Sequence, residues 1–223
     1  MGSLVARTWT IQPPPSWRKL AQVTGGVAVK GNWLVAPKLL VEFGDWTIVI
    51  RDQSQEGGGP FTLCTAEWLN PSHFAMEVSR RRSLLSKIGN LAQGLHPVSS
   101  SDAQLDDDFS IATNGPAQMS VLLSDREWRQ QLHSIDDSLS VKLHPKQSSF
   151  RLTRGNVGTG VSDLQLTSSH VVNDGQKLLA MIAVTAATLE RLEAVGITPP
   201  SVNQRPDYRR WLNARELERD HST

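Results

Sequence analysis

The sequence predicts an α+β fold with antiparallel strands in two sequential groups, helices packed on one side of the sheet and a long C-terminal closing helix. Two runs of short segments with strand character support this, one between residues 26 and 82 and one between 139 and 171. Helix start and stop signals flank the segments between and after these runs. We therefore expect one core, covered by helices that lie between and after the strand groups.

The first half of the chain predicts a short helix followed by a meander. Ser16 follows three prolines and is a good N-cap for a helix that ends at Gly25. In the segment from Trp46 to Arg51, apolar residues alternate with others, as in a strand with one apolar face. Short loops predict that strands close in sequence pair in an antiparallel meander. The expected strands are 26–30, 39–43, 46–53, 61–68 and 74–82.

The second half predicts further helices and a second strand group. A helix over 84–88 precedes a loop over 93–104 and an acidic turn that leads directly into a strand over 109–113. Pro116 and a capping box at 124–127 predict one or two helices up to residue 132. The second strand group is expected at 139–143, 150–153 and 164–171. Asp174 and Gly196 flank the predicted closing helix.

Composition predicts a soluble, cytoplasmic protein. Of the 223 residues, 39% are hydrophobic and 20% charged, which is typical of a globular chain. The net charge of +1 provides no global attraction to nucleic acid or an anionic membrane. Cys64 is the single cysteine, which fits a reducing compartment, and neither a secretory signal nor a run of about 20 apolar residues is present. We divide the chain into a lead (1–15), one α+β domain (16–196) and a tail (197–223).

Several segments in this order resemble an uncharacterised family of prokaryotic proteins. They are the strand Trp-x-Ile-x-Ile-x-Asp at 46–52, Phe61-Thr62, the turn at 84–89, and Asp106-x-Asp-Phe-x-Ile-x-x-Asn-Gly followed by Val121-Leu122-Leu123. In that family a Trp-started strand precedes an acidic Phe-Asp-x-x-Phe-x-Ile motif, and many members carry membrane-spanning helices before the domain. Leu105 stands here where the family has its first aromatic residue. The resemblance covers residues 17–195 and implies a fold but no known reaction.

The acidic run from Asp106 to Asp108 is the first candidate site. Hard cations bind several carboxylates, so Asp106 and Asp108 are possible metal or ligand residues, since alternate residues before a strand share a face. The alternative is an Asx-turn, in which a carboxylate binds nearby backbone N–H groups. Cys64 lies in an apolar strand and is expected to be a core residue. The six histidines lack metal-ligand spacing on a helix, and we predict no cofactor.

Two further candidates are a basic run and the tail. Arg80, Arg81 and Arg82 could contact phosphate, although the acidic residues 102–108 could instead neutralise them. In the tail, Tyr208, Trp211 and Leu212 follow the i, i+3, i+4 spacing of a helix with a narrow apolar stripe. This stripe could dock on its own domain or on a partner.

The sequence therefore leaves three functional hypotheses. The first is a non-catalytic soluble protein-interaction or regulatory domain with another protein as its partner. The second is a ligand- or metal-binding, hydrolase-like protein that uses Asp106, Asp108 and a distant histidine. The third and weaker hypothesis is nucleic-acid binding through Arg80 to Arg82.

Overall fold

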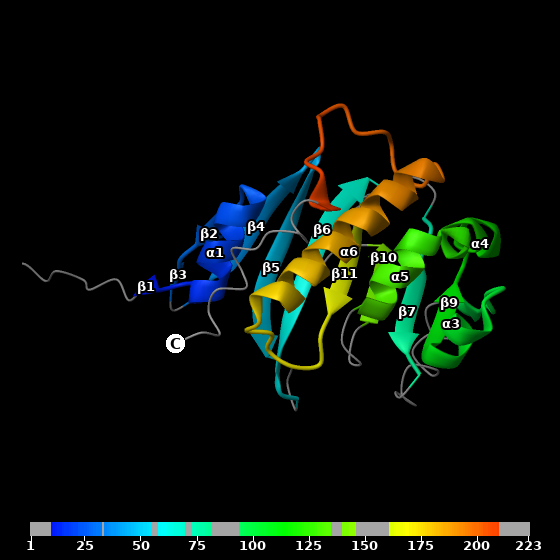
Figure 1. The fold of residues 1–223 in the computed structure, drawn as a ribbon, viewed down its shortest axis with the longest axis horizontal. Coiled ribbons are helices and arrows are strands. Elements are labelled where there is room, and N and C mark those ends of the chain that lie inside the picture. The colour runs from blue at the N-terminus through cyan, green and yellow to red at the C-terminus, as the bar shows by residue number, and fades with distance from the viewer. Residues whose placement is uncertain are drawn as a thin grey trace, which may run out of the picture.

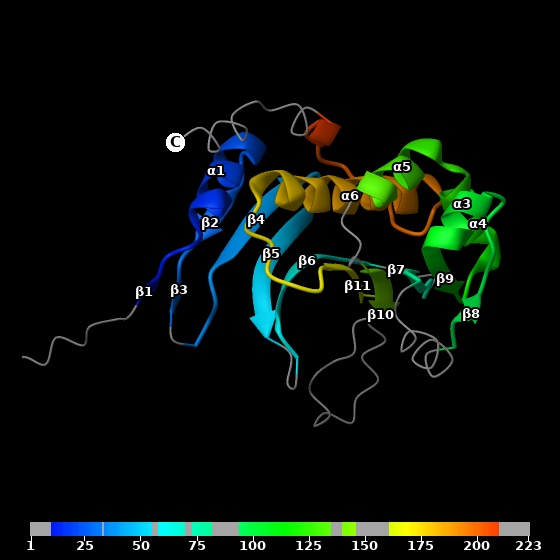
Figure 2. The same ribbon diagram turned by 60° about the horizontal axis from the view of Figure 1, so that its bottom comes forward.

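A computed structural model describes residues 10–32, 34–54, 58–69, 73–81, 94–134, 140–145 and 161–209. Within these residues the chain forms a nine-stranded antiparallel sheet, in the order β2-β4-β5-β6-β11-β10-β7-β9-β8, and a small β1-β3 ribbon. The helices lie on one face of the curved sheet (Figures 1 and 2). This arrangement confirms the predicted α+β class, with a C-terminal helix over the sheet.

The strands and helices have the following bounds. The strands are β1 (Thr10–Ile11), β2 (Val27–Val29), β3 (Gly31–Asn32), β4 (Lys38–Phe43), β5 (Trp46–Ser54), β6 (Pro60–Leu69), β7 (Met76–Arg80), β8 (His96–Pro97), β9 (Phe109–Thr113), β10 (Ser140–Pro145) and β11 (Val161–Thr167). The helices are α1 (Pro15–Thr24), α3 (Ala103–Asp108), α4 (Pro116–Ser124), α5 (Arg126–Ser134) and α6 (Gly175–Ala194). The expected helix over 84–88 and strand over 150–153 lie outside the described residues.

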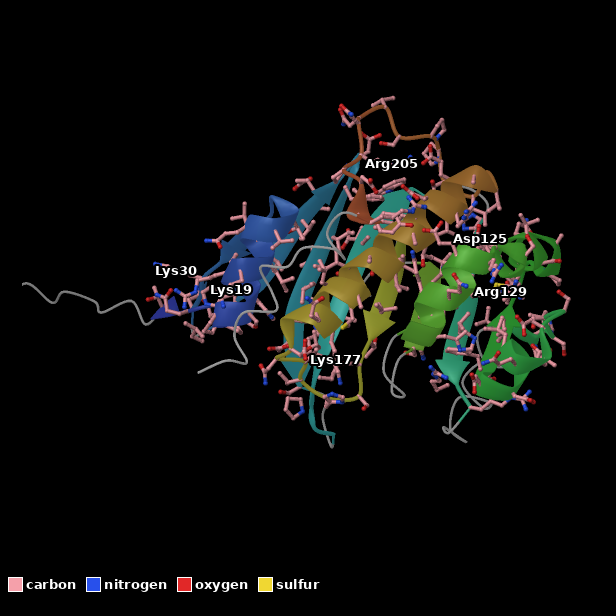
Figure 3. The ribbon with its side chains drawn as sticks, viewed as in Figure 1. Lys19, Lys30, Asp125, Arg129, Lys177 and Arg205 are labelled. Atoms are coloured by element: carbon pink, nitrogen blue, oxygen red, sulfur yellow. The ribbon has the colours of Figure 1, made fainter. Side chains whose placement is uncertain are left out.

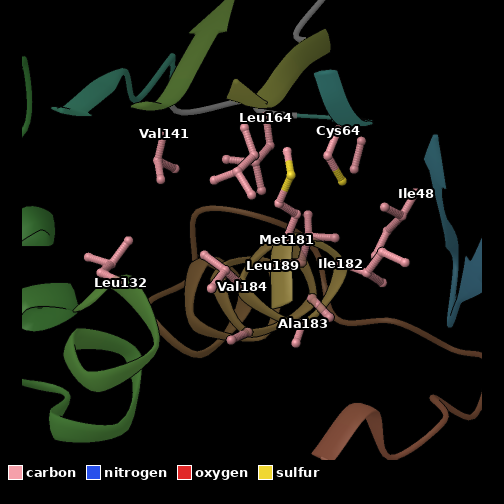
Figure 4. Packing of buried hydrophobic residues seen from close by; sticks show 14 of the residues in the cluster. Ile48, Cys64, Leu132, Val141, Leu164, Met181, Ile182, Ala183, Val184 and Leu189 are labelled. Carbon is pink, nitrogen blue, oxygen red and sulfur yellow. The ribbon is translucent and has the colours of Figure 1, made fainter. Parts of the chain in front are cut away.

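Helix α6 is the centre of the core. Asp174 caps its N-terminus by accepting hydrogen bonds from the backbone N–H groups of Gln176 (2.7 Å) and Lys177 (3.1 Å), and Gly196, at φ 73°, follows its C-terminus. The helix packs against the inner face of the sheet, where Met181 and Ile182 lie near side chains of the central strands (Figure 4). The predicted closing helix is thus confirmed, and twelve of its 20 residues are buried.

The meander prediction is correct only up to β6. The next strand in the chain, β7, does not pair with β6, because the β10-β11 hairpin lies between them. Strand β11 pairs with β6 over residues 161–167, and β10 pairs with β7 over residues 140–143. Three strand spacings of about 4.8 Å separate β6 from β7, and a six-residue connection can reach about 20 Å. The short loop between β6 and β7 is therefore long enough for the β10-β11 hairpin to lie between them. The alternation of apolar and polar residues along a strand does not encode which strand will be its neighbour.

The acidic segment differs from the prediction in its local structure. Residues 103–108 form helix α3 instead of an extended turn, because Asp102 caps the backbone N–H groups of Gln104 (3.1 Å) and Leu105 (3.3 Å). Leu105 is fully buried and anchors this short helix to the core. Asp106 and Asp108 therefore follow helical geometry, and the predicted alternation of their directions is wrong.

No helix among the described residues has both the length and the apolar character needed to cross a bilayer.

Candidate functional site

Asp108 joins two of the sequence candidates at the end of α3. Its Oδ2 atom lies 3.5 Å from Nη1 of Arg80 on β7 and 3.2 Å from Nδ1 of His133 on α5. Below this contact, the guanidinium of Arg80 lies 4.4 Å from the ring centroid of Phe109, and the His133 ring meets the same ring edge-on at 5.3 Å. The cluster can fasten α5 to β7 and β9, and a carboxylate that orients an imidazole is also an arrangement used in acid–base chemistry.

Asp106 does not take part in this cluster. Its Oδ1 atom accepts a hydrogen bond of 2.8 Å from the backbone N–H of Ser100, so Asp106 fixes the chain that leads into α3. Across the part of the chain that the structure describes, no three His, Cys, Asp or Glu side chains are placed to bind a metal ion. Of the two predicted carboxylates, only Asp108 meets a distant histidine.

The described part of the basic run, Arg80 and Arg81, also contacts Asp108. Arg80 contacts Asp108 and Phe109, while the backbone N–H of Arg81 donates to the Asp108 carbonyl at 3.1 Å. Arg82 lies outside the described residues. Pairing of Arg80 with an acid of its own chain is the alternative that the sequence analysis set against phosphate binding.

Residues 197–209, the C-terminal arm, run back over the helical layer to the β4-β5 turn (Figure 1). Asp45 in that turn accepts a hydrogen bond from the backbone N–H of Val202 at 2.7 Å and another from the side chain of Asn203. The Val202 hydrogen bond is the main reason that the pKa of Asp45 is lowered. Arg205 (labelled in Figure 3) pairs with Glu193 on α6 and lies 4.7 Å from the ring centroid of Trp46.

The arm ends in a buried aromatic anchor. Tyr208 is 1% exposed, packs edge-on against Phe43 at 6.1 Å between ring centroids, and its hydroxyl accepts a hydrogen bond of 3.4 Å from Gln131. Arg209 donates from Nε (2.6 Å) and Nη2 (2.9 Å) to the carboxylate of Glu127 on α5. These bonds are the main reason that the pKa of Glu127 is lowered.

Tyr208 therefore docks on its own domain, which is one of the two alternatives predicted for the tail stripe. Its ring belongs to the hydrophobic core and does not offer a surface to a partner. Trp211 and Leu212 lie outside the described residues, so a partner contact through them stays a prediction.

A polar cluster that the sequence patterns did not indicate lies on the sheet face opposite the helices. Val141 and Leu143 of β10 point into the core, so Lys142 and His144 face the other side. Nζ of Lys142 lies 3.1 Å from Oε1 of Glu77, its neighbour on β7, and Glu77 is only 4% exposed. Burial and the charge of Lys142 lower the pKa of His144, whereas Glu77 opposes this shift. The available signal was that Glu77 and Lys142 alternate with apolar residues in the predicted strands 74–82 and 139–143, whereas His144 lies just beyond the second of these.

A half-buried carboxylate beneath the arm gives a test of the local electrostatics. Burial raises the pKa of Glu190, and Glu127 adds to this effect, while three nearby arginines oppose it. The folded state therefore holds the Glu190 proton more tightly than the unfolded state, so stability falls as pH rises from the ordinary glutamate pKa through the raised folded pKa.

We expect Glu190→Gln to raise the urea midpoint at neutral pH and to change it little at a pH below the ordinary glutamate pKa. The matched control is Glu193→Gln on the same helix, which should lower stability because Glu193 pairs with Arg205 and accepts the Ser201 N–H at 3.1 Å. A midpoint that Glu190→Gln lowers at neutral pH would contradict this view of the carboxylate.

Comparisons with models of protein families, with curated proteins and with solved structures gave no match for this chain.

Proposed function

We propose that this chain is a non-catalytic protein-interaction or regulatory domain whose C-terminal arm holds the start of the tail at a fixed place for a protein partner. The observation that carries the proposal is the anchor formed by Tyr208 and Arg209. Trp211 and Leu212 follow this anchor by two and three residues. A short apolar stripe that starts from a fixed point loses less conformational freedom on binding than a free tail.

The contacts of the candidate catalytic groups support a non-catalytic role. The thiol of Cys64 is fully buried beside the hydroxyl of Thr185 at 3.2 Å, and burial raises its pKa to about 12. A thiol in this setting is not ionised at neutral pH, and the thiolate is the nucleophilic form. The carboxylate of Asp106 accepts a hydrogen bond from the backbone N–H of Ser100.

The structure also indicates how to test the tail. A chain that ends at Thr198 would lose Tyr208 from the core, so a lost partner could reflect an altered fold. A chain that ends at Arg209 keeps the arm and removes only the residues after it. The affinity-purified full chain, the chain ending at Arg209 and the variant Trp211→Ala should be compared by native mass spectrometry after incubation with extract of the source cells.

We expect one stoichiometric protein partner with the full chain and at least about tenfold less of it with either altered form, since aromatic anchors commonly dominate interfaces. Glu218→Ala, a polar substitution further along the tail, is the matched control and should keep the partner. A partner that binds all forms equally, or no protein partner with the full chain, would contradict the proposal.

A second candidate function follows from the contact between Asp108 and His133. If this pair serves a hydrolase-like or ligand-binding site, a small molecule should remain on the chain ending at Arg209 and be lost in Asp108→Asn. Denaturing mass spectrometry of the organic extract from both proteins detects such a ligand. Identical extracts would reject this candidate. The weaker hypothesis of nucleic-acid binding has less support, because Arg80 already pairs with Asp108.

A further inference from the structure

A small built turn holds two apolar side chains in solvent between β3 and β4. Oδ1 of Asn32 accepts hydrogen bonds from the backbone N–H groups of Leu34 (2.9 Å) and Val35 (2.8 Å), and the N–H of Asn32 donates to the Val35 carbonyl at 2.8 Å. Leu34 is nevertheless 71% exposed and Val35 54% exposed. Leu34 and Val35 are therefore exposed although Asn32 fixes their backbone N–H groups.

The close approach of the chain to Gly31 allows only glycine at this position beside the turn. A Cβ atom at Gly31 would lie 2.5 Å from the Val35 carbonyl oxygen and 2.6 Å from the backbone nitrogen of Pro37, both closer than real contacts allow. The chain after the turn thus packs directly onto Gly31, which a larger residue would prevent. The turn is held at both ends, by the Asn32 side chain and by this close approach.

Other exposed apolar residues belong to the same end of the molecule. Val27 on β2 is 60% exposed and Ile11 on β1 is 47% exposed, and Ile11 pairs directly with Gly31. Strands β1, β2 and β3 lie together at one end, beside α1 (Figures 1 and 2). We call this region, residues 10–32 and 34–41, the basic apolar end. Apolar side chains gathered on one part of a surface are typical of an interaction site.

The charge of the basic apolar end has a single sign. Residues 10–41 contain four basic residues, Arg18, Lys19, Lys30 and Lys38, and no acidic residue. Figure 3 shows Lys19 and Lys30 at this end of the structure. The first acidic residue of the chain is Glu42, so the overall net charge of +1 combines a basic end with a net acidic remainder. The overall charge therefore conceals a stretch of the chain in which every charged side chain is basic.

We propose that the basic apolar end docks on an anionic lipid surface, with the turn at Leu34 and Val35 inserted at the boundary of the acyl chains. A second copy of the chain would bring like charges together, and nucleic-acid bases gain little from aliphatic side chains, which do not stack. A bilayer offers a partner to both the basic and the apolar side chains, because anionic head groups lie directly above an apolar layer.

The order of residues from Lys30 to Lys38 fits insertion of the turn with the lysines nearer the head groups. Lys30 precedes β3 and Lys38 begins β4, so a lysine stands on each side of the turn. When the turn enters the boundary of the acyl chains, long lysine side chains at its base can keep their ammonium groups at the head-group level. Arg18, exposed on the adjacent helix α1, adds a further charge facing solvent at this end.

The test is sedimentation of the full chain with vesicles of phosphatidylcholine alone or mixed with phosphatidylserine. We expect affinity for the mixed vesicles to be about tenfold higher or more, and to fall with added salt. Replacing both apolar residues, Leu34→Ser with Val35→Ser, should reduce binding to the mixed vesicles about tenfold, because each exposed side chain contributes apolar area to insertion. Lys30→Glu should reduce it as well.

The matched control is Val202→Ser, because Val202 is 91% exposed but lies in the C-terminal arm. This substitution should leave vesicle binding unchanged, and so should removal of the residues after Arg209, which separates this inference from the proposed role of the tail. Circular dichroism verifies that each variant is folded. Equal affinity for both vesicle types, or unchanged binding of the double serine variant, would overturn the inference. Loss of a bound acidic protein in that variant, without vesicle binding, would assign this end to a protein partner instead.

Discussion

Replacing Trp128 by alanine is expected to lower the free energy of unfolding by about 3–5 kcal/mol, the range observed when a buried aromatic residue is truncated. Trp128 is 1% exposed on α5, and its indole N–H donates a hydrogen bond of 2.9 Å to the hydroxyl of Thr188 on α6. That hydroxyl in turn donates to the Val184 carbonyl at 2.7 Å. The substitution therefore removes both apolar contact and the polar link between two helices of the layer.

Urea unfolding followed by far-ultraviolet circular dichroism measures this loss without relying on tryptophan fluorescence. The control is Trp128→Phe, which keeps most of the apolar contact and removes the N–H donor. It should cost about 1–2 kcal/mol, because Thr188 keeps its hydrogen bond to Val184. Equal losses in the two variants would mean that the aromatic contact that phenylalanine keeps contributes little to the packing of α5 on α6.

Local patterns were sufficient for most of the elements. Trp46, Ile48 and Ile50 alternate along β5 and are all buried, which confirms the apolar face predicted for that strand. Asp174 and Gly196 flank α6 as expected, because capping depends on residues that are close in sequence. These features are encoded within a few positions of one another.

The pairing of distant strands was not encoded in the same way. The β10-β11 hairpin enters the sheet between β6 and β7, although alternation in all four strands is compatible with other neighbours. The choice of neighbour depends on the fit of whole faces against α6 and on the reach of the connections, neither of which is a local signal.

The candidate site shows the same limit. The sequence suggested that the acidic residues 102–108 could neutralise Arg80, but it did not indicate which carboxylate would do so, and His133 was not singled out. Their meeting results from the pairing of β7 with β9 and from the packing of α5, which bring together residues far apart in the chain. For Tyr208, helical spacing identified an apolar residue but could not choose between its own domain and a partner.

The second large effect is expected in the C-terminal arm, on which the proposed function depends. Tyr208→Ala should lower the free energy of unfolding by about 3–5 kcal/mol, since the ring is 1% exposed and packs against Phe43 in the main core. Tyr208→Phe should cost about 1 kcal/mol or less, because only the long hydrogen bond of 3.4 Å from Gln131 is lost. The ion pair of Arg209 with Glu127 cannot replace the buried ring, since both of its side chains are exposed and exposed pairs contribute little.

Equilibrium unfolding of Tyr208→Ala beside Tyr208→Phe is the most direct test of the central claim, that the C-terminal arm is part of the folded domain and fixes the start of the tail. We predict a urea midpoint well below that of the unaltered chain for the alanine variant, and a midpoint close to it for the phenylalanine variant. Equal midpoints for Tyr208→Ala and the unaltered chain would mean that the arm is not anchored in the core, and would contradict the account.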